Sequence, residues 1–164
     1  MNVQDVPLLL RREIEARILA PFVRELEDEF GADPVRAVLQ RTIRGVARAQ
    51  GEAMARRLGG NSLTHLLQVL AMWRQGGALT VDMIHHDETT LRFHVTRCAY
   101  AEMYRALGLA HLGATLSCQR DAAFLEGFNP NLRFERKHTL MEGHDFCDFC
   151  YTSAPGGLSE TQEG

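Results

Sequence analysis

The residues that could do chemistry in this chain are concentrated between Cys98 and Cys150. This stretch contains all four cysteines, and its last eight residues, 143–150, bring thiols, carboxylates and an imidazole close together. A thiol can act as a nucleophile or a metal ligand, and a carboxylate can act as a general base. We therefore expect the functional site in this stretch and expect the remainder of the chain to position it.

Two features of the stretch suggest a catalytic thiol. Cys118 and Asp121 are three residues apart, so on a helix they share a face and can point into one cleft. Cys98 lies where a predicted strand passes into a predicted helix, a position at which free amides and the helix dipole lower the pKa of a thiol. The alternative for both cysteines is a structural role as small core residues.

A metal site is the other possibility. His144, Cys147 and Cys150 have ligand-like spacing, and together with Cys118 they could hold a tetrahedral zinc ion. On a strand, however, Cys147 and Cys150 would point to opposite faces. We therefore expect no metal or other cofactor, with this zinc site as the alternative.

Composition limits the class of protein. The 164 residues are 45% hydrophobic, which suits a single domain with its own core. A net charge of −3 gives no basic field, so we expect neither nucleic acid nor an anionic membrane as a partner. No apolar run is long enough to cross a bilayer, and Met1 to Leu10 lacks the features of a signal peptide. We expect a cytoplasmic protein, in which the cysteines remain free thiols.

The first part of the chain has the apolar period of amphipathic helices. One should run from Pro7 to Gly31 with a bend or restart at Pro21, because proline lacks an amide hydrogen. Another should begin with Asp33 as its cap and end near 58, and a third should cover 62–73. Exposed apolar positions on the first helices are compatible with a homodimer.

From Leu79 onward the period alternates between that of strands and that of helices. We predict a β-hairpin over 79–95 with its turn at 86–89, helices over 99–107 and 112–126, and strands over 132–140 and 146–151. The predicted fold class is α+β, in which N-terminal helices pack with a small antiparallel sheet and inserted helices. Residues 1–152 should form one domain, and the composition of 153–164 is that of a disordered tail.

Several motifs resemble those of the L-2-amino-thiazoline-4-carboxylic acid hydrolase family, and the likeness covers most of residues 8–151. In the C-terminal half the matching motifs are Arg97-Cys98-x-Tyr100-x-Glu102, Leu107-Gly108, Leu116-x-Cys118-x-x-Asp121 and Thr139-Leu140-Met141-x-Gly143-x-x-x-Cys147-Asp148-Phe149. In the helical N-terminal half they are Arg12-x-Ile14-Glu15 and the Ala-Gln-Gly step at Ala49 to Gly51. The C-terminal half more faintly resembles vinyl-reductase-type small-molecule-binding domains. That second resemblance implies an alternative, a sensor-like module that binds a small molecule or zinc without turnover.

The first resemblance implies a hydrolase that opens a cyclic isothiourea with water and releases N-carbamoyl-cysteine. Either a thiolate attacks the ring carbon, with Cys118 the first candidate and Cys98 and Cys147 next, or Asp121 activates a water molecule. Substrate-binding roles then fall to nearby polar and aromatic residues: Asp121 or Glu102 for the amidine, Arg97, Arg136 or His138 as the cation, and Tyr100 as a cleft-lining ring.

Overall fold

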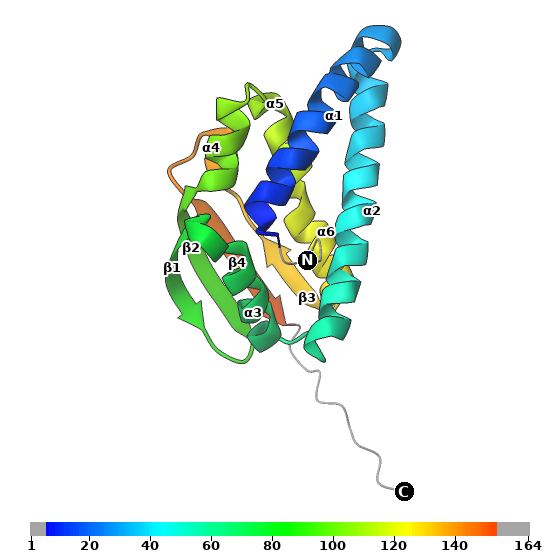
Figure 1. Ribbon diagram of the computed structural model, residues 1–164. Helices are drawn as coiled ribbons and strands as arrows, with labels where there is room; N and C mark the ends of the chain where they lie inside the picture. The colour runs from blue at the N-terminus through cyan, green and yellow to red at the C-terminus, as the bar shows by residue number, and fades with distance from the viewer. Residues whose placement is uncertain (1–5, 154–164) are drawn as a thin grey trace, which may run out of the picture.

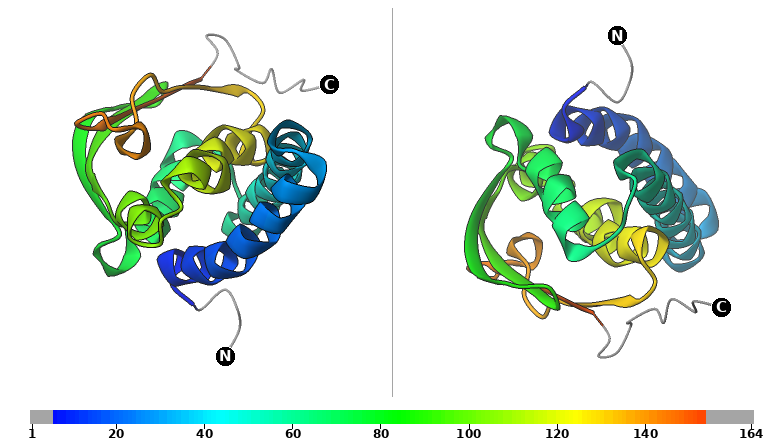
Figure 2. Two further views of the ribbon diagram at one scale, coloured as in Figure 1. Left: turned by 90° about the horizontal axis from the view of Figure 1, so that it is seen from above. Right: turned by 90° about the horizontal axis from the view of Figure 1, so that it is seen from below.

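The computed structural model of the protein describes residues 6–153 and has two layers (Figure 1). A curved four-stranded sheet forms one layer, and the helices cover its concave face (Figure 2). The predicted α+β class is therefore confirmed. The site described below lies where the two layers meet.

The first two helices form a long antiparallel pair, α1 (Leu8–Phe30) and α2 (Ala32–Leu58). α1 continues through Pro21 without the predicted restart. Proline has no amide hydrogen to donate to the carbonyl of Arg17, and both residues are exposed, so water can solvate that carbonyl. The predicted Asp33 cap is also wrong, because Gly31 joins the helices directly with a φ of +85°. Asp33 and Pro34 instead lie within the first turn of α2.

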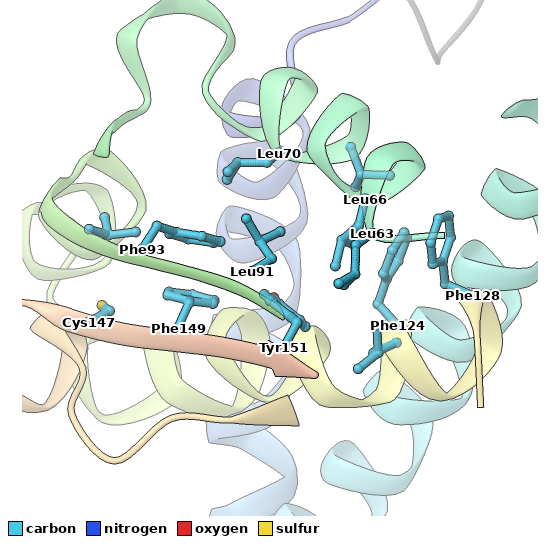
Figure 3. Close-up of a cluster of buried hydrophobic side chains, with 13 residues drawn as sticks. Leu63, Leu66, Leu70, Leu91, Phe93, Phe124, Phe128, Cys147, Phe149 and Tyr151 are labelled. Carbon is cyan, nitrogen blue, oxygen red and sulfur yellow. The ribbon is translucent and has the colours of Figure 1, made fainter. Parts of the chain in front are cut away.

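The connection to the sheet runs through α3 (Leu63–Trp73) and the short η2 (Gln75–Gly77). Either Asn61 or Ser62 could cap α3 by residue type, and Ser62 does so: its hydroxyl accepts from the His65 amide, and the His65 ring accepts from the Ser62 amide. The apolar face of α3, including Leu66 and Leu70, packs onto the sheet (Figure 3).

The sheet contains β1 (Leu79–His86), β2 (Thr90–Cys98), β4 (Cys147–Ser153) and β3 (Leu132–Glu135), all antiparallel and in that spatial order. Cys147, Phe149 and Tyr151 of β4 point toward the helices (Figure 3). They are paired in register with Val95, Phe93 and Leu91 of β2. This inner face packs with buried side chains of α3 and α6 in one of the two clusters of the hydrophobic core.

β3 is shorter than predicted, because the chain leaves the sheet after Glu135. Arg136 turns inward to form an ion pair with Asp121. The amides of Lys137 and His138 donate to the Asp148 carboxylate, at 2.9 and 2.6 Å, instead of to a neighbouring strand. The return to β4 passes through η4 (Leu140–Glu142).

The helices that enter the site follow β2 directly. They are α4 (Ala99–Ala106), α5 (Ala110–Gly113) and α6 (Gln119–Phe128), and a π-helical turn, η3 (Ala114–Cys118), joins the last two. The predicted helix over 112–126 is confirmed, but the π-helical turn within it has no signature in the sequence. Such turns are frequent at functional sites.

α6 lies very close to α2, and two glycines allow this approach. A Cβ added to Gly51 would lie 2.0 Å from the carbonyl oxygen of Phe124, and one added to Gly127 would lie 2.0 Å from that of Arg48. α6 is therefore held by backbone contact, which fixes the position of the site residues at its N-terminal end.

α1 carries an exposed apolar stripe with a spacing of four residues, at Leu10, Ile14, Ile18 and Phe22. Ile18 and Phe22 are 66% and 61% exposed. The prediction of a homodimer depends on these exposed positions, and it stays a prediction.

None of the helices within residues 6–153 combines the length and the apolar character that a membrane span requires. Ser153 belongs to β4, and the rest of the predicted tail lies outside the described residues.

Candidate functional site

Three cysteines and one aspartate from separate elements lie close together. Cys98 ends β2, Cys118 ends the π-helical turn, Cys147 begins β4, and Asp121 is in the first turn of α6. Negative charge on Cys147 or Asp121 would raise the pKa of Cys98, and charge on any of the other three would raise the pKa of Cys118. The sequence motifs that surround these residues therefore meet in one place, where the two hydrophobic clusters of the protein join.

Arg136 holds this group together from the end of β3. Its Nη1 donates to Oδ2 of Asp121, and its Nη2 donates to the carbonyl oxygen of Cys118 at 3.0 Å. The guanidinium carbon lies 5.3 and 5.0 Å from the ring centres of Phe134 and Phe149, a cation–π arrangement. Arg136 thus fixes the Asp121 carboxylate relative to the Cys118 backbone.

The three thiols of the site are neutral at neutral pH. Burial raises the pKa of Cys98 to about 11, and it also raises those of Cys118 and Cys147 above their usual range. Arg136 lowers the pKa of Cys118 and of Cys147, but burial outweighs it. The depressed thiol pKa expected for Cys98 at its helix N-terminus is absent for the same reason. A base must therefore remove a proton before any of these cysteines attacks a substrate.

Asp121 is the carboxylate nearest to such a role. Burial raises its pKa, while the neighbouring guanidinium groups of Arg136, Arg12 and Arg120 act to lower it. Although burial works against the charge of Arg136, Asp121 raises the pKa of that guanidinium. Because burial raises its pKa, Asp121 is a stronger base than an ordinary surface carboxylate, and Arg136 is the first of the groups that oppose this rise.

The site contains residues that the sequence analysis did not identify. Tyr151 is 1% exposed, and burial raises its pKa. The charge of Asp121 raises this pKa further, and the charge of Arg136 lowers it. Tyr104 is equally buried, and burial raises its pKa. The charges of Arg12 and Arg120 act to lower that pKa, and charge on Cys118 would raise it. Tyr151 could have been found from its strand alternation with Cys147 and Phe149.

Other predicted residues lie elsewhere. Arg97 and Glu102 form a surface ion pair at 2.6 Å, and both side chains are about half exposed. His138 is also at the surface, where its Nδ1 lies 3.2 Å from the Asp148 carboxylate. Tyr100 does face the site, near Cys98 and Asp121, and its hydroxyl donates to the carbonyl of Trp73 at 3.2 Å.

The four residues of the alternative zinc site do not converge. Cys147 and Cys150 are on opposite faces of β4, as expected for a strand, and His144 packs edge-on against His138 at the surface. Within residues 6–153 no group of three or more histidine, cysteine, aspartate or glutamate side chains is arranged to hold a metal ion.

Two hollows on the described surface lie away from the site cysteines. One, of about 240 Å³, lies between α6 and β3 and is lined by Ala122, Leu125, Glu126, Pro130, Leu132 and Phe134. The other, of about 360 Å³, is lined by Thr89, Thr90, Arg133, Thr152 and Ser153. Phe134 connects the first hollow to the site, because the same ring packs against Arg136.

The neutral thiols lead to a prediction about alkylation. At pH 7 iodoacetamide should modify Cys98, Cys118 and Cys147 slowly in the native protein, because burial keeps them protonated. Peptide mass spectrometry of samples quenched over time measures each rate, and raising the pH toward 10 should accelerate Cys98. Cys150, on the outer face of β4, is the internal reference. Modification of Cys118 faster than Cys150 at pH 7 would contradict this expectation.

Comparison with known proteins adds a family and a fold. A model of the L-2-amino-thiazoline-4-carboxylic acid hydrolase family matches residues 11–151, which is most of the chain. No curated protein matches the sequence significantly.

Two solved structures share the fold. The phenol-responsive sensory domain of the transcription activator PoxR, with phenol, superposes with a TM-score of 0.52 at 13% identity, covering 83% of this chain and 73% of that one. A trafficking protein particle complex subunit 3 from Naegleria fowleri, covalently bound to palmitic acid, gives 0.52 at 9% identity, covering 88% and 96%. At such identities the likeness concerns the fold alone.

Proposed function

Since the chain belongs to the L-2-amino-thiazoline-4-carboxylic acid hydrolase family, we propose that it hydrolyses a small cyclic isothiourea. The specific reaction is opening of the thiazoline ring to N-carbamoyl-cysteine. The observation that carries this proposal is the convergence of Cys118 and Asp121, with one guanidinium bonded to the Asp121 carboxylate and to the Cys118 carbonyl.

Cys118 serves as the nucleophile in this proposal, and Asp121 moves the proton. Asp121 accepts the thiol proton while the sulfur attacks the ring carbon between sulfur and nitrogen. The bond from that carbon to the ring sulfur then breaks, and the departing sulfur takes the proton from Asp121. The substrate is now attached to Cys118 as an acyclic isothiourea.

Water completes the reaction. Asp121 accepts one proton from a water molecule that attacks the same carbon, the bond to Cys118 breaks, and Asp121 returns that proton to the Cys118 sulfur. The second proton of the water passes from oxygen to the neighbouring nitrogen, which leaves a carbonyl group. The product is the urea of N-carbamoyl-cysteine. The pKa of Asp121, which burial raises, suits a group that accepts and returns a proton twice in each cycle.

Turnover by three variants tests the proposal. Cys118→Ala and Asp121→Asn should each lower kcat/KM for L-2-amino-thiazoline-4-carboxylic acid by at least ~10²-fold, because each removes a group needed in the transition state. Cys150→Ala is the matched control and should retain activity, because Cys150 faces away from the site. Mass spectrometry of rapidly quenched wild type should find an adduct on Cys118.

Other outcomes would revise or reject the mechanism. An active Cys118→Ala variant beside an inactive Asp121→Asn variant would assign direct attack by water that Asp121 activates. Loss of wild-type activity with a chelator, restored by zinc, would move the chemistry to a metal. Absence of turnover by folded wild type would reject the hydrolase.

A second candidate function is binding of a small molecule without turnover. It is favoured by the depth of the site, whose thiols are all neutral, and by a fold shared with a phenol-responsive sensory domain. Calorimetry distinguishes the two: a module of this kind would bind the thiazoline and leave it unchanged.

A further inference from the structure

Two buried arginines lie beside the proposed catalytic group and share a single carboxylate. Arg12 of α1 and Arg120 of α6 are only 6% and 8% exposed. Nη1 of Arg12 donates to both oxygens of Glu15, at 2.8 and 2.9 Å. Nη2 of Arg120 donates to Oε2 of Glu15 at 3.1 Å, and its Nε donates to the carbonyl of Leu116 at 2.7 Å.

This arrangement has an excess of positive charge. Arg136 and Asp121 neutralise each other, which leaves two buried guanidinium groups facing Glu15, whose side chain is 38% exposed. Burial lowers the pKa of Arg120 to about 10, and the nearby charge of Arg12 acts in the same direction. A buried charge without a full partner is costly, so this part of the protein lacks one negative charge.

Hydrogen-bond donors are also left over in the same region. Nη1 of Arg120 and Nε of Arg11 are buried and have no hydrogen-bond partner within residues 6–153. The Tyr151 hydroxyl, near Asp121 and Arg136, is buried and unpaired as well. Buried polar groups in folded proteins are almost always paired, so the unpaired Nη1 of Arg120 indicates where a ligand supplies an acceptor.

We propose that Arg12 and Arg120 form the anion-binding end of the site and that Nη1 of Arg120 donates to the carboxylate of a small ligand. This inference rests on the proposed function, because it places the ligand's heterocycle at Cys118 and Asp121. The two ends are adjacent: Arg120 and Asp121 are neighbours in α6, and the charges of Arg12 and Arg120 both lower the pKa of the Asp121 carboxylate. A guanidinium suits a carboxylate because its parallel N–H groups match the two oxygens.

A pair of compounds that differ only in the carboxylate tests the assignment. L-2-Amino-thiazoline-4-carboxylic acid has the group, and 2-amino-2-thiazoline lacks it. Arg120→Met should lower kcat/KM for the acid about 10- to 100-fold, mostly through KM, because a hydrogen bond to a charged group is lost. The same variant should lose less with 2-amino-2-thiazoline, so the ratio of kcat/KM for the acid to kcat/KM for 2-amino-2-thiazoline should fall by about 10-fold or more. Arg120→Lys should restore part of the loss, and Arg41→Met, an exposed arginine of α2, should change neither compound.

The outcomes separate this inference from the proposed function. An equal loss for both compounds, or a wild type that does not distinguish them, would overturn the anion-binding role while leaving the hydrolase in place. Calorimetric binding of the acid but not of 2-amino-2-thiazoline, without turnover, would support the anion-binding end and reject the hydrolase. If Arg120→Met does not fold, two measurements still test the anion-binding role: the preference of wild type for the acid over 2-amino-2-thiazoline, and the change of that preference in Arg120→Lys. Binding of neither compound to folded wild type would reject both.

Discussion

Arg136→Met is expected to lower the free energy of unfolding by about 3–5 kcal/mol at pH 8, the usual cost of removing one partner from a buried ion pair. Arg136 is 11% exposed and Asp121 is 20% exposed at the side chain, so water can do little to replace the missing guanidinium. The variant also loses the hydrogen bond to the Cys118 carbonyl. Urea unfolding followed by circular dichroism measures the change.

The loss should depend on pH in a defined direction. Burial already raises the pKa of Asp121, and removing Arg136 takes away the main group that opposes this. A carboxyl whose pKa is higher in the folded state binds its proton more tightly there, so stability is greatest at low pH. The stability of the variant should therefore fall as the pH rises above about 4, the unfolded pKa of aspartate, and level off above the folded pKa.

Two controls establish that the pair is the cause. Arg133→Met removes an exposed arginine from the same strand and should cost little. Asp121→Asn combined with Arg136→Met removes both charges and should be more stable at pH 8 than Arg136→Met alone. Additive losses in the double variant would show that the two side chains do not act as a pair.

Gly51→Ala and Gly127→Ala should each destabilise the protein by about 1–3 kcal/mol, the usual cost of overfilling a packed interface. In both cases the added methyl group would meet a backbone carbonyl oxygen at 2.0 Å, and backbone cannot rotate away as a flexible side chain can. The helices must therefore separate. Because α6 carries Asp121, both variants should also lose activity.

Gly45→Ala is the matched control, on the same helix as Gly51. No atom lies within 4 Å of a Cβ added there, so the substitution should stabilise the protein by about 0.5–1 kcal/mol through helix propensity. Thermal unfolding of the three variants gives the comparison. A stabilised Gly51→Ala variant would show that α2 and α6 are farther apart than described.

Local patterns predicted the elements well, because periodicity and turn residues act over short distances. The hairpin around Asp87 and the Ser62 cap are both formed by neighbours in sequence. The errors at Pro21 and Asp33 were local, whereas the error at β3 arose from a contact between distant segments. β3 ends early because Arg136 pairs with Asp121, which is 15 residues away in the sequence. The alternation of apolar and polar residues over 132–140 contains no sign of this contact.

The site was partly predictable for the same reason. The motifs identified Cys118 and Asp121, and the fold brings them together with Cys98 and Cys147. Arg12 was missed because an arginine in an amphipathic helix is usually solvated, and only its pairing with Glu15 near α6 shows otherwise. The protonation of the thiols was also unpredictable, since burial is a property of the folded chain.

The π-helical turn at Ala114–Cys118 widens the helical backbone between α5 and α6. Such a turn holds one residue more than an α-helix needs, so α5 and α6 are set at different rotations about their common axis. Leu112 consequently packs with α1, whereas Phe124 packs with the sheet. Loss of a single codon in this turn would rotate one half by about 100° against the other. Chain length at this point, as much as residue identity, determines which side chains of α5 and α6 face the candidate site.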